Sequence, residues 1–360
     1  MKLLIDCHVF DGKFQGTRTY IEGLYTHLTH HDDIEFYFAA KDKERLKIIF
    51  GERPNIHYIP LKSESSILRL AYEFPSIIKD YGIDYAHFQY VSPLKKYCKE
   101  IVTIHDLLFL DYPQYFPLGY RLKNKWLFNR SSKRADLLLT VSDYSKREIT
   151  KHFGIVDNKI HITYNSVLPA SGIGNIDVRT IYGLRKYILT VGRIEPRKNY
   201  FSLLKAYINL GLYEKGYDLV IVGVRDLSYK LFENYYKNLS DLQKKSIFLM
   251  SVPFSHLVEL YRHCSLFVFP SFAEGFGIPP LEAIEYGCPL LCSNATAMGE
   301  FPLDDNIMFN PGNQKEFEQK LLSELSSPTD MTVMRERIRD KYDWQSIANH
   351  FYQLLTEIKD

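Results

Sequence analysis

Side chains capable of chemistry gather in residues 270–283, PSFAEGFGIPPLEA, where two carboxylates lie on either side of a glycine-containing turn. Glu274 lies in the loop, and Glu282 lies in about the first turn of the helical segment that follows. Carboxylate oxygens accept hydrogen bonds from hydroxyl groups. The pair can therefore bracket one ligand, and we expect Glu274 near the hydroxyls of a sugar and Glu282 near a ribose.

The same turn has the features of an anion site. Gly275 and Gly277 have no Cβ, so the amides of residues 275–278 can approach a phosphate closely. Pro279 and Pro280 suit the first turn of a helix, where a missing N–H removes no hydrogen bond. Because free amides and the helix dipole favour negative charge at a helix N-terminus, the segment predicts a phosphate-binding site.

A second polar segment, residues 191–199 (VGRIEPRKN), also follows an apolar run and precedes a helical pattern. Arg193 offers a bidentate guanidinium and Lys198 a compact charge, so the two can neutralise a diphosphate without a metal ion. A basic loop alone is also typical of an ordinary solvated surface. The segment becomes informative because it accompanies the glutamate-containing turn.

The elements that must position both segments follow one pattern, in which short Val-, Ile- and Leu-rich runs alternate with longer segments of helical period. That order is typical of βαβ units, which build parallel sheets. In the first half we expect strands at Lys2–Cys7, Glu35–Ala39, His57–Pro60, Tyr85–Phe88, Ile101–Ile104, Leu137–Val141 and Ile160–Ile162. In the second half we expect them at Tyr187–Val191, Asp218–Val222, Ile247–Leu249, Leu266–Phe269, Pro289–Cys292 and Ile307–Phe309.

The pattern restarts after residues 169–174 (PASGIG), whose Pro, Ser and Gly content marks an exposed connection. A chain of 360 residues also exceeds the size at which one hydrophobic core keeps growing. We therefore expect two α/β domains, residues 1–170 and 171–342. Residues 343–360 read as an amphipathic helix, which we expect to pack back on the first domain.

Composition restricts the class of protein. A net charge of +2 and the absence of a recognised module argue against nucleic-acid binding. No apolar stretch approaches the roughly 20 residues that span a bilayer, so we expect a cytoplasmic protein. The five cysteines form no CxxC pair and are odd in number, so we expect them to be reduced and to bind no zinc.

Residues 119–134 (GYRLKNKWLFNRSSKR) interleave basic residues with aromatic and aliphatic ones and contain no acidic residue. This composition suits contact with an anionic lipid surface or with a lipid-phosphate acceptor. The alternative is a solvated helix face above an ordinary core stripe. Sequence alone leaves both readings open. The first would place the protein peripherally at the inner face of the membrane.

Residues 191–199 and residues 271–291 (SFAEGFGIPPLEAIEYGCPLL) together resemble glycosyltransferase family 4, a large retaining family with the GT-B fold. Glu274 and Glu282 match the two glutamates of the family's Glu-x7-Glu signature. Shorter segments resemble its first glycine loop, its His-Asp segment, its Ser-x-x-Ser-Lys segment and its Pro-Asn-Gly-Val segment, in that order: residues 16–20 (GTRTY), 103–107 (TIHDL), 141–146 (VSDYSK) and 164–167 (YNSV). The similarity extends over nearly the whole chain.

Two segments depart from the family pattern. Ser166 stands where relatives often have glycine, so the turn is altered. Residues 293–300 (SNATAMGE) lack the usual Pro-Glu ending, which affects the expected wall of the nucleotide site rather than the reaction.

The resemblance implies two Rossmann-like domains whose parallel sheets face each other across a cleft, with the acceptor on the first domain and the nucleotide sugar on the second. The implied catalytic residues are His105, Arg193, Lys198 and Glu274. The implied donor-binding residues are Gly16, Gly192, Arg193, Lys198, Gly275, Phe276, Gly277, Ile278 and Glu282. Neither a metal ion nor a cofactor is implied besides the nucleotide-sugar donor.

The reaction that the resemblance implies is retaining transfer of a hexose from a nucleotide-diphosphate sugar to a glycan or lipid-linked acceptor in surface polysaccharide synthesis. The TIHDL segment, followed by Phe109 and Tyr112-Pro113, looks like that of mannosyl- and rhamnosyl-type transferases. GDP-mannose is therefore the first candidate donor, and UDP-hexoses are the alternative. A sugar-nucleotide epimerase or hydrolase on the same scaffold is the main rival, and a non-catalytic partner subunit is the third reading.

Overall fold

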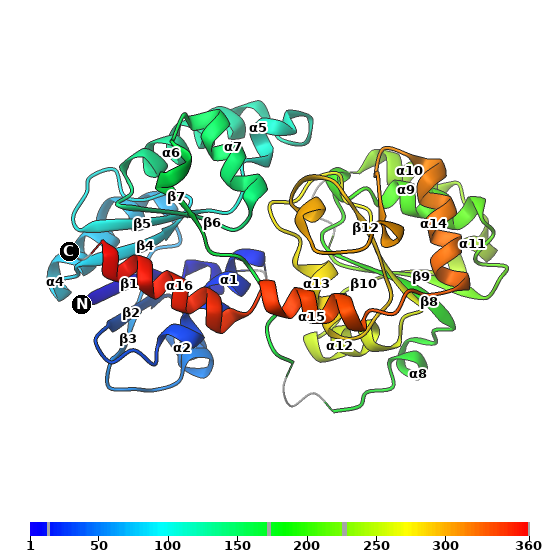
Figure 1. Cartoon of the computed structure of the whole chain (residues 1–360), viewed down its shortest axis with the longest axis horizontal. Helices are drawn as coiled ribbons and strands as arrows, with labels where there is room; N and C mark the ends of the chain where they lie inside the picture. Colours follow the sequence, from blue (N-terminus) through cyan, green and yellow to red (C-terminus); the bar gives the residue numbers. More distant parts are fainter. Residues whose placement is uncertain (13–14, 171–173, 225–228, 359–360) are drawn as a thin grey trace. The chain divides into compact units, whose positions relative to one another are not determined.

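The computed structural model describes residues 1–12, 15–170, 174–224 and 229–358, and the chain divides into two compact units (Figure 1). Unit 1 comprises Met1–Leu168 and Tyr342–Asp360, and unit 2 comprises Pro169–Lys341. The expected junction at residues 169–174 includes residues 171–173, which lie outside the described residues. The last segment joins unit 1 from Tyr342 onward.

Unit 1 is built on a seven-stranded sheet of order β3-β2-β1-β4-β5-β6-β7, in which all neighbouring strands are parallel. Its strands are β1 (Lys2–Asp6), β2 (Glu35–Ala40), β3 (Ile56–Pro60), β4 (Tyr85–Gln89), β5 (Lys99–Ile104), β6 (Leu137–Thr140) and β7 (Ile160–Ile162). Its helices are α1 (Gly16–Leu28), α2 (Lys43–Phe50), α3 (Ser66–Leu68), α4 (Phe74–Tyr81), α5 (Leu108–Asp111), α6 (Leu118–Arg134), α7 (Asp143–Phe153) and α16 (Trp344–Glu357). Short helical turns cover η1 (His8–Phe10), η2 (Arg69–Glu73), η3 (Pro113–Tyr115) and η4 (Asp157–Lys159).

Unit 2 repeats the plan with a six-stranded parallel sheet of order β10-β9-β8-β11-β12-β13. Its strands are β8 (Lys186–Val191), β9 (Tyr217–Val222), β10 (Ile247–Met250), β11 (Leu266–Phe269), β12 (Leu290–Ser293) and β13 (Met308–Phe309). Its helices are α8 (Val178–Tyr182), α9 (Tyr200–Asn209), α10 (Lys230–Lys237), α11 (Asp241–Lys245), α12 (Phe254–His263), α13 (Ile278–Glu285), α14 (Gln314–Ser326) and α15 (Thr332–Lys341). Short helical turns cover η5 (Pro196–Lys198), η6 (Thr296–Glu300) and η7 (Asp305–Ile307).

The expected strands are confirmed to within two residues at each end. They were predictable because strands covered on both faces of a parallel sheet read as continuous apolar runs, as the buried run Leu266–Phe269 does. In unit 2 the strand order reverses between β8 and β11, which are direct neighbours. Ligands bind open α/β sheets at the carboxyl ends of strands beside such a reversal. Both segments singled out in the sequence follow these two strands.

The last helix, α16, packs on α1 within unit 1, and Figure 1 shows the two side by side. A Cβ added at Gly23 would come within 2.1 Å of the Trp344 indole, so the two helices touch where α1 has no side chain. The indole Nε1 of Trp344 donates a hydrogen bond to the carbonyl of Val167 at 3.0 Å. Further along, the ring of Phe351 meets that of Tyr25 edge to face, with centroids 6.1 Å apart.

The expectation that all cysteines are reduced is wrong for one pair, because Cys264 and Cys288 form a disulfide. Each residue lies just before a strand, Cys264 before β11 and Cys288 before β12, and these strands are parallel neighbours. The topology therefore brings their Cα atoms to 6.6 Å, although the sequence shows no cysteine motif. Cys7 and Cys292 are buried and unpaired, and Cys98 is half-buried.

Candidate functional site

The loop after β8 begins with a glycine that no other residue could replace without strain. Gly192 has a φ of 143° and donates its N–H to the carbonyl of Val222 at 2.9 Å. A Cβ at this position would meet the hydroxyl of Tyr200 at 3.0 Å. The facing Gly223 is also constrained, since its Cβ would come within 1.9 Å of the Gly192 carbonyl oxygen. The backbones after β8 and β9 thus approach each other closely because both positions are glycine.

The loop after β8 is joined to the segment after β11 by hydrogen bonds from a side-chain amide and from the backbone. Asn199 adopts a left-handed conformation, with a φ of 56°, and its Nδ2 donates to the carbonyl of Pro270 at 3.1 Å. The N–H of Phe272 donates to the carbonyl of Arg197 at 2.8 Å. These bonds hold the two polar segments together at one edge of the unit 2 sheet.

Glu274 lies at the centre of a buried ion cluster that joins the two segments. Its Oε1 lies 2.5 Å from Nζ of Lys198, and its Oε2 lies 2.8 Å from a guanidinium nitrogen of Arg197. Arg197 also pairs with Glu195 at 2.7 Å. Only 8% of Glu274 and 8% of Lys198 is exposed, so water screens these contacts weakly.

Burial alone would raise the pKa of Glu274, but the charges of Arg197 and Lys198 outweigh it and hold that pKa at about 2. Glu274 is therefore ionised at neutral pH. For Lys198, burial is the larger effect, and its pKa is lowered although Glu274 opposes the shift. The Lys198 ammonium also lies 5.2 Å from the centre of the Phe269 ring.

The turn after Glu274 leads directly into α13. Gly277 is the N-cap residue with a φ of 102°, a left-handed conformation, and a Cβ there would meet Met298 at 3.2 Å. Ile278 is the first helical residue, followed by the two prolines. The ring of Phe276 packs edge to face on Phe301, with centroids 5.7 Å apart. The N–H of Glu274 donates to Oγ1 of Thr296 at 2.9 Å.

Glu282 lies on the second turn of α13, and its Oε2 accepts a hydrogen bond from the hydroxyl of Tyr261 on α12 at 2.8 Å. Burial raises the pKa of Glu282. Tyr261 is fully buried, so its hydroxyl holds the Glu282 carboxylate in one orientation from the neighbouring helix.

His105 belongs to unit 1, where it follows β5. Its Nε2 donates to Oε1 of Gln89 at 2.7 Å, and its ring meets Tyr20 edge to face at 5.1 Å. Its backbone carbonyl accepts a hydrogen bond from the hydroxyl of Ser145 at 2.8 Å. Burial lowers the pKa of His105 to about 3, so the imidazole is neutral at physiological pH. Gly16 is exposed at the first position of α1.

The structure thus brings Lys198, Glu274, Gly192 and the start of α13 together at one edge of unit 2, and places Arg193 half-buried in the same loop. The sequence analysis did not predict that Arg197 pairs with Glu274. Its position directly before Lys198, in the same basic loop, would have indicated a place beside that lysine. Thr296 and Tyr261 were also missed, because only the fold brings them to the two glutamates.

Two family models together match nearly the whole chain. The model described as Glycosyltransferase Family 4 matches residues 14–170, and the one described as Glycosyl transferases group 1 matches residues 175–341. O-antigen chain mannosyltransferase B of Escherichia coli is 29% identical over 321 residues, which cover 80% of this chain and 83% of that protein. O-antigen chain mannosyltransferase RfbU of Salmonella typhimurium is 29% identical over 263 residues, with 72% and 70% covered.

Solved structures share the fold at low sequence identity. Sucrose-phosphate synthase from Thermosynechococcus elongatus is 15% identical with a TM-score of 0.78, covering 99% of this chain and 98% of that one. Anabaena HepE, solved in complex with UDP-glucose, is 16% identical with a TM-score of 0.73, covering 99% and 100%. These likenesses confirm the expected fold class, α/β with the GT-B architecture.

Proposed function

Since the chain belongs to glycosyltransferase family 4, we propose that it transfers a hexose from a nucleotide-diphosphate sugar to a glycan or lipid-linked acceptor in the synthesis of a surface polysaccharide. The observation that carries this proposal is the ion cluster of Glu274, Lys198 and Arg197 beside the N-terminus of α13. The cluster lies where the strand order reverses, the usual ligand position in such sheets.

The charges of the cluster suggest how a donor would bind. Arg197 and Lys198 face Glu195 and Glu274, so the cations are largely compensated before a donor arrives. We propose that the donor diphosphate shares Lys198 with Glu274 and takes further hydrogen bonds from Arg193 and from the amides of residues 275–278. The sugar hydroxyls would then donate to the Glu274 carboxylate, and Glu282 would accept from the ribose.

For the reaction we propose departure and attack on the same face of the sugar, which retains the anomeric configuration without a covalent glycosyl-enzyme. The bond from the anomeric carbon to the diphosphate oxygen breaks, and the acceptor oxygen bonds to that carbon. The acceptor proton passes to the β-phosphate oxygen. Fixed positive charge at the leaving diphosphate and an oriented acceptor supply the catalysis, so no metal ion is required. We place the neutral His105 beside the transferred sugar as a hydrogen-bonding group.

The relatives point to the donor and acceptor. Because both mannosyltransferases act on O-antigen chains by name, GDP-mannose is the first donor to test, and UDP-hexoses come second because HepE was solved with UDP-glucose. A growing glycan as acceptor is in keeping with the same names, and we propose a lipid-linked acceptor beside it from the family resemblance.

The test is incubation of the pure protein with each nucleotide sugar, with and without a lipid-linked oligosaccharide acceptor. We expect free nucleoside diphosphate only when acceptor is present, undiminished activity in EDTA, and retained configuration in the product by NMR of the anomeric proton. Release without acceptor would identify a hydrolase, and conversion of the donor sugar would identify an epimerase. Loss of activity in EDTA, restored by Mg²⁺ or Mn²⁺, would contradict the metal-free mechanism.

A further inference from the structure

One face of helix α6 packs against the rest of unit 1. The ring of Phe128 stacks on Tyr90 with centroids 4.9 Å apart and meets Phe109 edge to face at 5.4 Å. Tyr120 also touches Phe109, at 5.9 Å, so its ring contributes to the same packing although part of it is exposed. Leu127 packs against the same buried cluster. These contacts account for the aromatic residues on one side of the helix.

The opposite face carries an apolar stripe that nothing in the described part of the chain covers. Leu118, Leu122 and Trp126 are 62%, 62% and 60% exposed. They are four residues apart, so they lie one above the other along about 12 Å of the helix. Large apolar side chains that gather on a surface mark an interaction site.

Exposed lysines flank this stripe. Lys123, Lys125 and Lys133 are exposed, and no ion pair joins them to an acidic group within the described residues. The helix itself contains no acidic residue. The outer face of α6, defined by the three apolar residues and these three lysines, is therefore both apolar and strongly positive.

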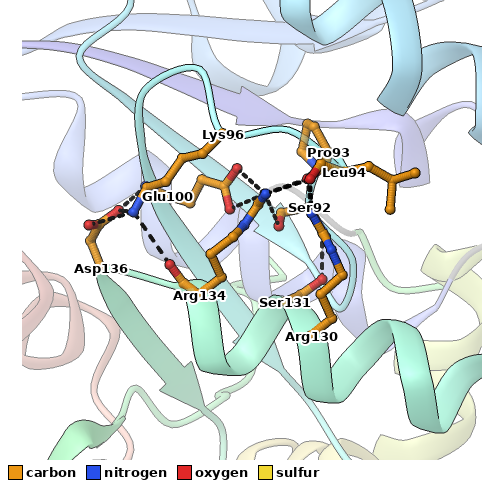
Figure 2. A network of polar contacts seen from close by, with 9 residues as sticks. All are labelled: Ser92, Pro93, Leu94, Lys96, Glu100, Arg130, Ser131, Arg134 and Asp136. Carbon is orange, nitrogen blue, oxygen red and sulfur yellow. Dashed lines mark hydrogen bonds and ion pairs between the residues drawn. The ribbon is translucent and has the colours of Figure 1, made fainter.

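Two arginines near the C-terminal end of the same helix have a different role. Figure 2 shows Arg130 and Arg134 turned toward the carbonyls of Pro93 and Leu94. Arg134 also binds both carboxylate oxygens of the buried Glu100, at 2.6 and 2.8 Å. The hydroxyl of Ser131 accepts from the N–H of Ser92 at 3.1 Å. These contacts hold the C-terminal end of α6 on the rest of unit 1, so Arg130 and Arg134 are not among the charges offered to a partner, whereas the three exposed lysines are.

We propose that the outer face of α6 binds an anionic lipid surface, with the helix lying in the plane of the membrane. Leu118, Leu122 and Trp126 would enter the boundary between headgroups and acyl chains, and the lysines would contact lipid phosphates. A lipid surface is favoured over a protein partner because lysine is depleted at protein interfaces, whereas Lys and Trp together are typical of membrane-surface helices. Leu94, whose carbonyl accepts from Arg134 at the C-terminal end of α6, is 65% exposed, and its side chain points away from the two arginines in Figure 2.

This proposal does not depend on the transferase reaction, and the position of the two tryptophans makes it testable in the full-length protein. The chain has two tryptophans, of which Trp126 is 60% exposed and Trp344 is 4% exposed. Vesicles containing phosphatidylglycerol should shift the emission of Trp126 to shorter wavelength and carry the protein into the pellet on centrifugation. Phosphatidylcholine vesicles should do neither. Trp126→Phe should still bind the anionic vesicles but show no emission shift.

Charge reversal provides the decisive comparison. Lys123→Glu, Lys125→Glu and Lys133→Glu together should weaken partition into anionic vesicles by about 100-fold or more. Lys215→Glu, Lys230→Glu and Lys237→Glu change the net charge equally at exposed positions of unit 2 and should have less than about a threefold effect. Leu118→Ser with Leu122→Ser should cost about tenfold or more. Circular dichroism would verify that each variant is folded.

Three results would overturn the proposal. The first is equal binding to both kinds of vesicle, and the second is no binding to either. The third is a wild-type dimer in light scattering that the α6 substitutions, but not the unit 2 substitutions, convert to monomer, because the face would then be an interface between copies of the chain.

Discussion

At the scale of single residues, the candidate site is organised around one buried carboxylate. Glu274 compensates two cations that would otherwise repel each other in a poorly hydrated position, and it is held ionised by them. A buried charge keeps this state only when its partners are well placed. In the proposed function the same carboxylate also accepts hydrogen bonds from the sugar hydroxyls, and it would then link donor recognition to the positioning of Lys198.

The two glutamates should respond differently to removal of their charge. Glu274→Gln should lower kcat by about 100-fold, because contacts to the reacting sugar strengthen as charge develops. It should not raise the donor KM, since Lys198 and Arg197 become freer to bind the diphosphate. Glu282→Gln should raise the donor KM about tenfold at nearly unchanged kcat. Steady-state kinetics with varied donor would measure both effects, and equal small changes in the two variants would refute the assignment.

Buried histidines should make unit 1 sensitive to acid. His87 is fully buried between the hydroxyls of Tyr25, at 2.6 Å, and Thr103, at 2.7 Å, and burial lowers its pKa to about 3, as for His105. An unfolded histidine titrates near 6.5, so between pH 6.5 and 3 the unfolded chain binds more protons than the folded one. The stabilisation is complete above pH 6.5 and is lost as pH falls, by about 1.4 kcal/mol per pH unit for each histidine.

Urea unfolding between pH 4.5 and 7.5 would measure this dependence, because both tryptophans lie in unit 1 and their emission reports that unit. His87→Gln should reduce the slope by about 1.4 kcal/mol per pH unit. His30→Gln, at an exposed position, is the matched control. An unchanged slope in His87→Gln would mean that His87 is protonated in the folded protein.

At the scale of elements, the contact between α1 and α16 depends on a missing side chain. In a helix interior, replacing glycine by alanine ordinarily stabilises by about 0.5–1 kcal/mol. At Gly23 the added Cβ would lie 2.1 Å from the Trp344 indole, so overpacking should prevail and Gly23→Ala should destabilise unit 1 by about 1–3 kcal/mol. Gly119→Ala on α6, where nothing lies within 4 Å, should be neutral or stabilising.

Urea denaturation of both variants would test this comparison. Adding Trp344→Leu to Gly23→Ala should recover part of the loss if the two side chains clash directly. Equal stability of Gly23→Ala and wild type would show that α16 shifts to accommodate the methyl group at no cost.

The sequence was sufficient for the elements and for part of the site. Strands such as β11 were predictable because their apolar runs reflect burial on both faces, and the glycine turn before α13 was predictable because its φ of 102° at Gly277 suits glycine. The pairing of Cys264 with Cys288 and the bond from Tyr261 to Glu282 were not predictable, because they depend on which strands and helices become neighbours. Periodicity shows that a segment is buried, but it does not show which other segment packs against it.

The reading of residues 119–134 illustrates the same limit. The sequence showed basic residues without acidic neighbours, but the fold pairs Arg134 with Glu100 and leaves Lys123, Lys125 and Lys133 exposed. Within the described residues, no helix is long and apolar enough to cross a membrane. The sequence does not distinguish the arginine that binds Glu100 from the lysines that stay exposed, because the difference depends on the folded structure.

At the scale of the whole molecule, two units with separate cores should unfold separately. Removing residues 343–360 deletes the helix that buries Trp344, Ile347, Phe351, Leu354 and Leu355. Burial of these side chains is worth about 10 kcal/mol in total, which is as large as the stability of a typical domain. Unit 1 should therefore not fold in the truncated chain, whereas unit 2 keeps every residue of its ion cluster.

Differential scanning calorimetry with and without nucleoside diphosphate would test this. In the full chain, ligand at about 100 times its Kd should stabilise unit 2 by about 2.7 kcal/mol and raise one transition. The truncated chain should show only that ligand-sensitive transition. A truncated protein with both transitions intact would refute the role assigned to α16.

The return of α16 to unit 1 also has a consequence for synthesis on the ribosome. Most of unit 1, up to Leu168, is made before unit 2, but its core is closed by residues made after unit 2, from Tyr342 onward. At about 5–20 residues per second, the unit must wait roughly 10–35 s while unit 2 is translated. During that interval the surface of α1 that later receives Trp344 and Phe351 is uncovered. Unit 2 should therefore be complete before unit 1, and chaperones that hold apolar surfaces should act on unit 1 rather than on unit 2.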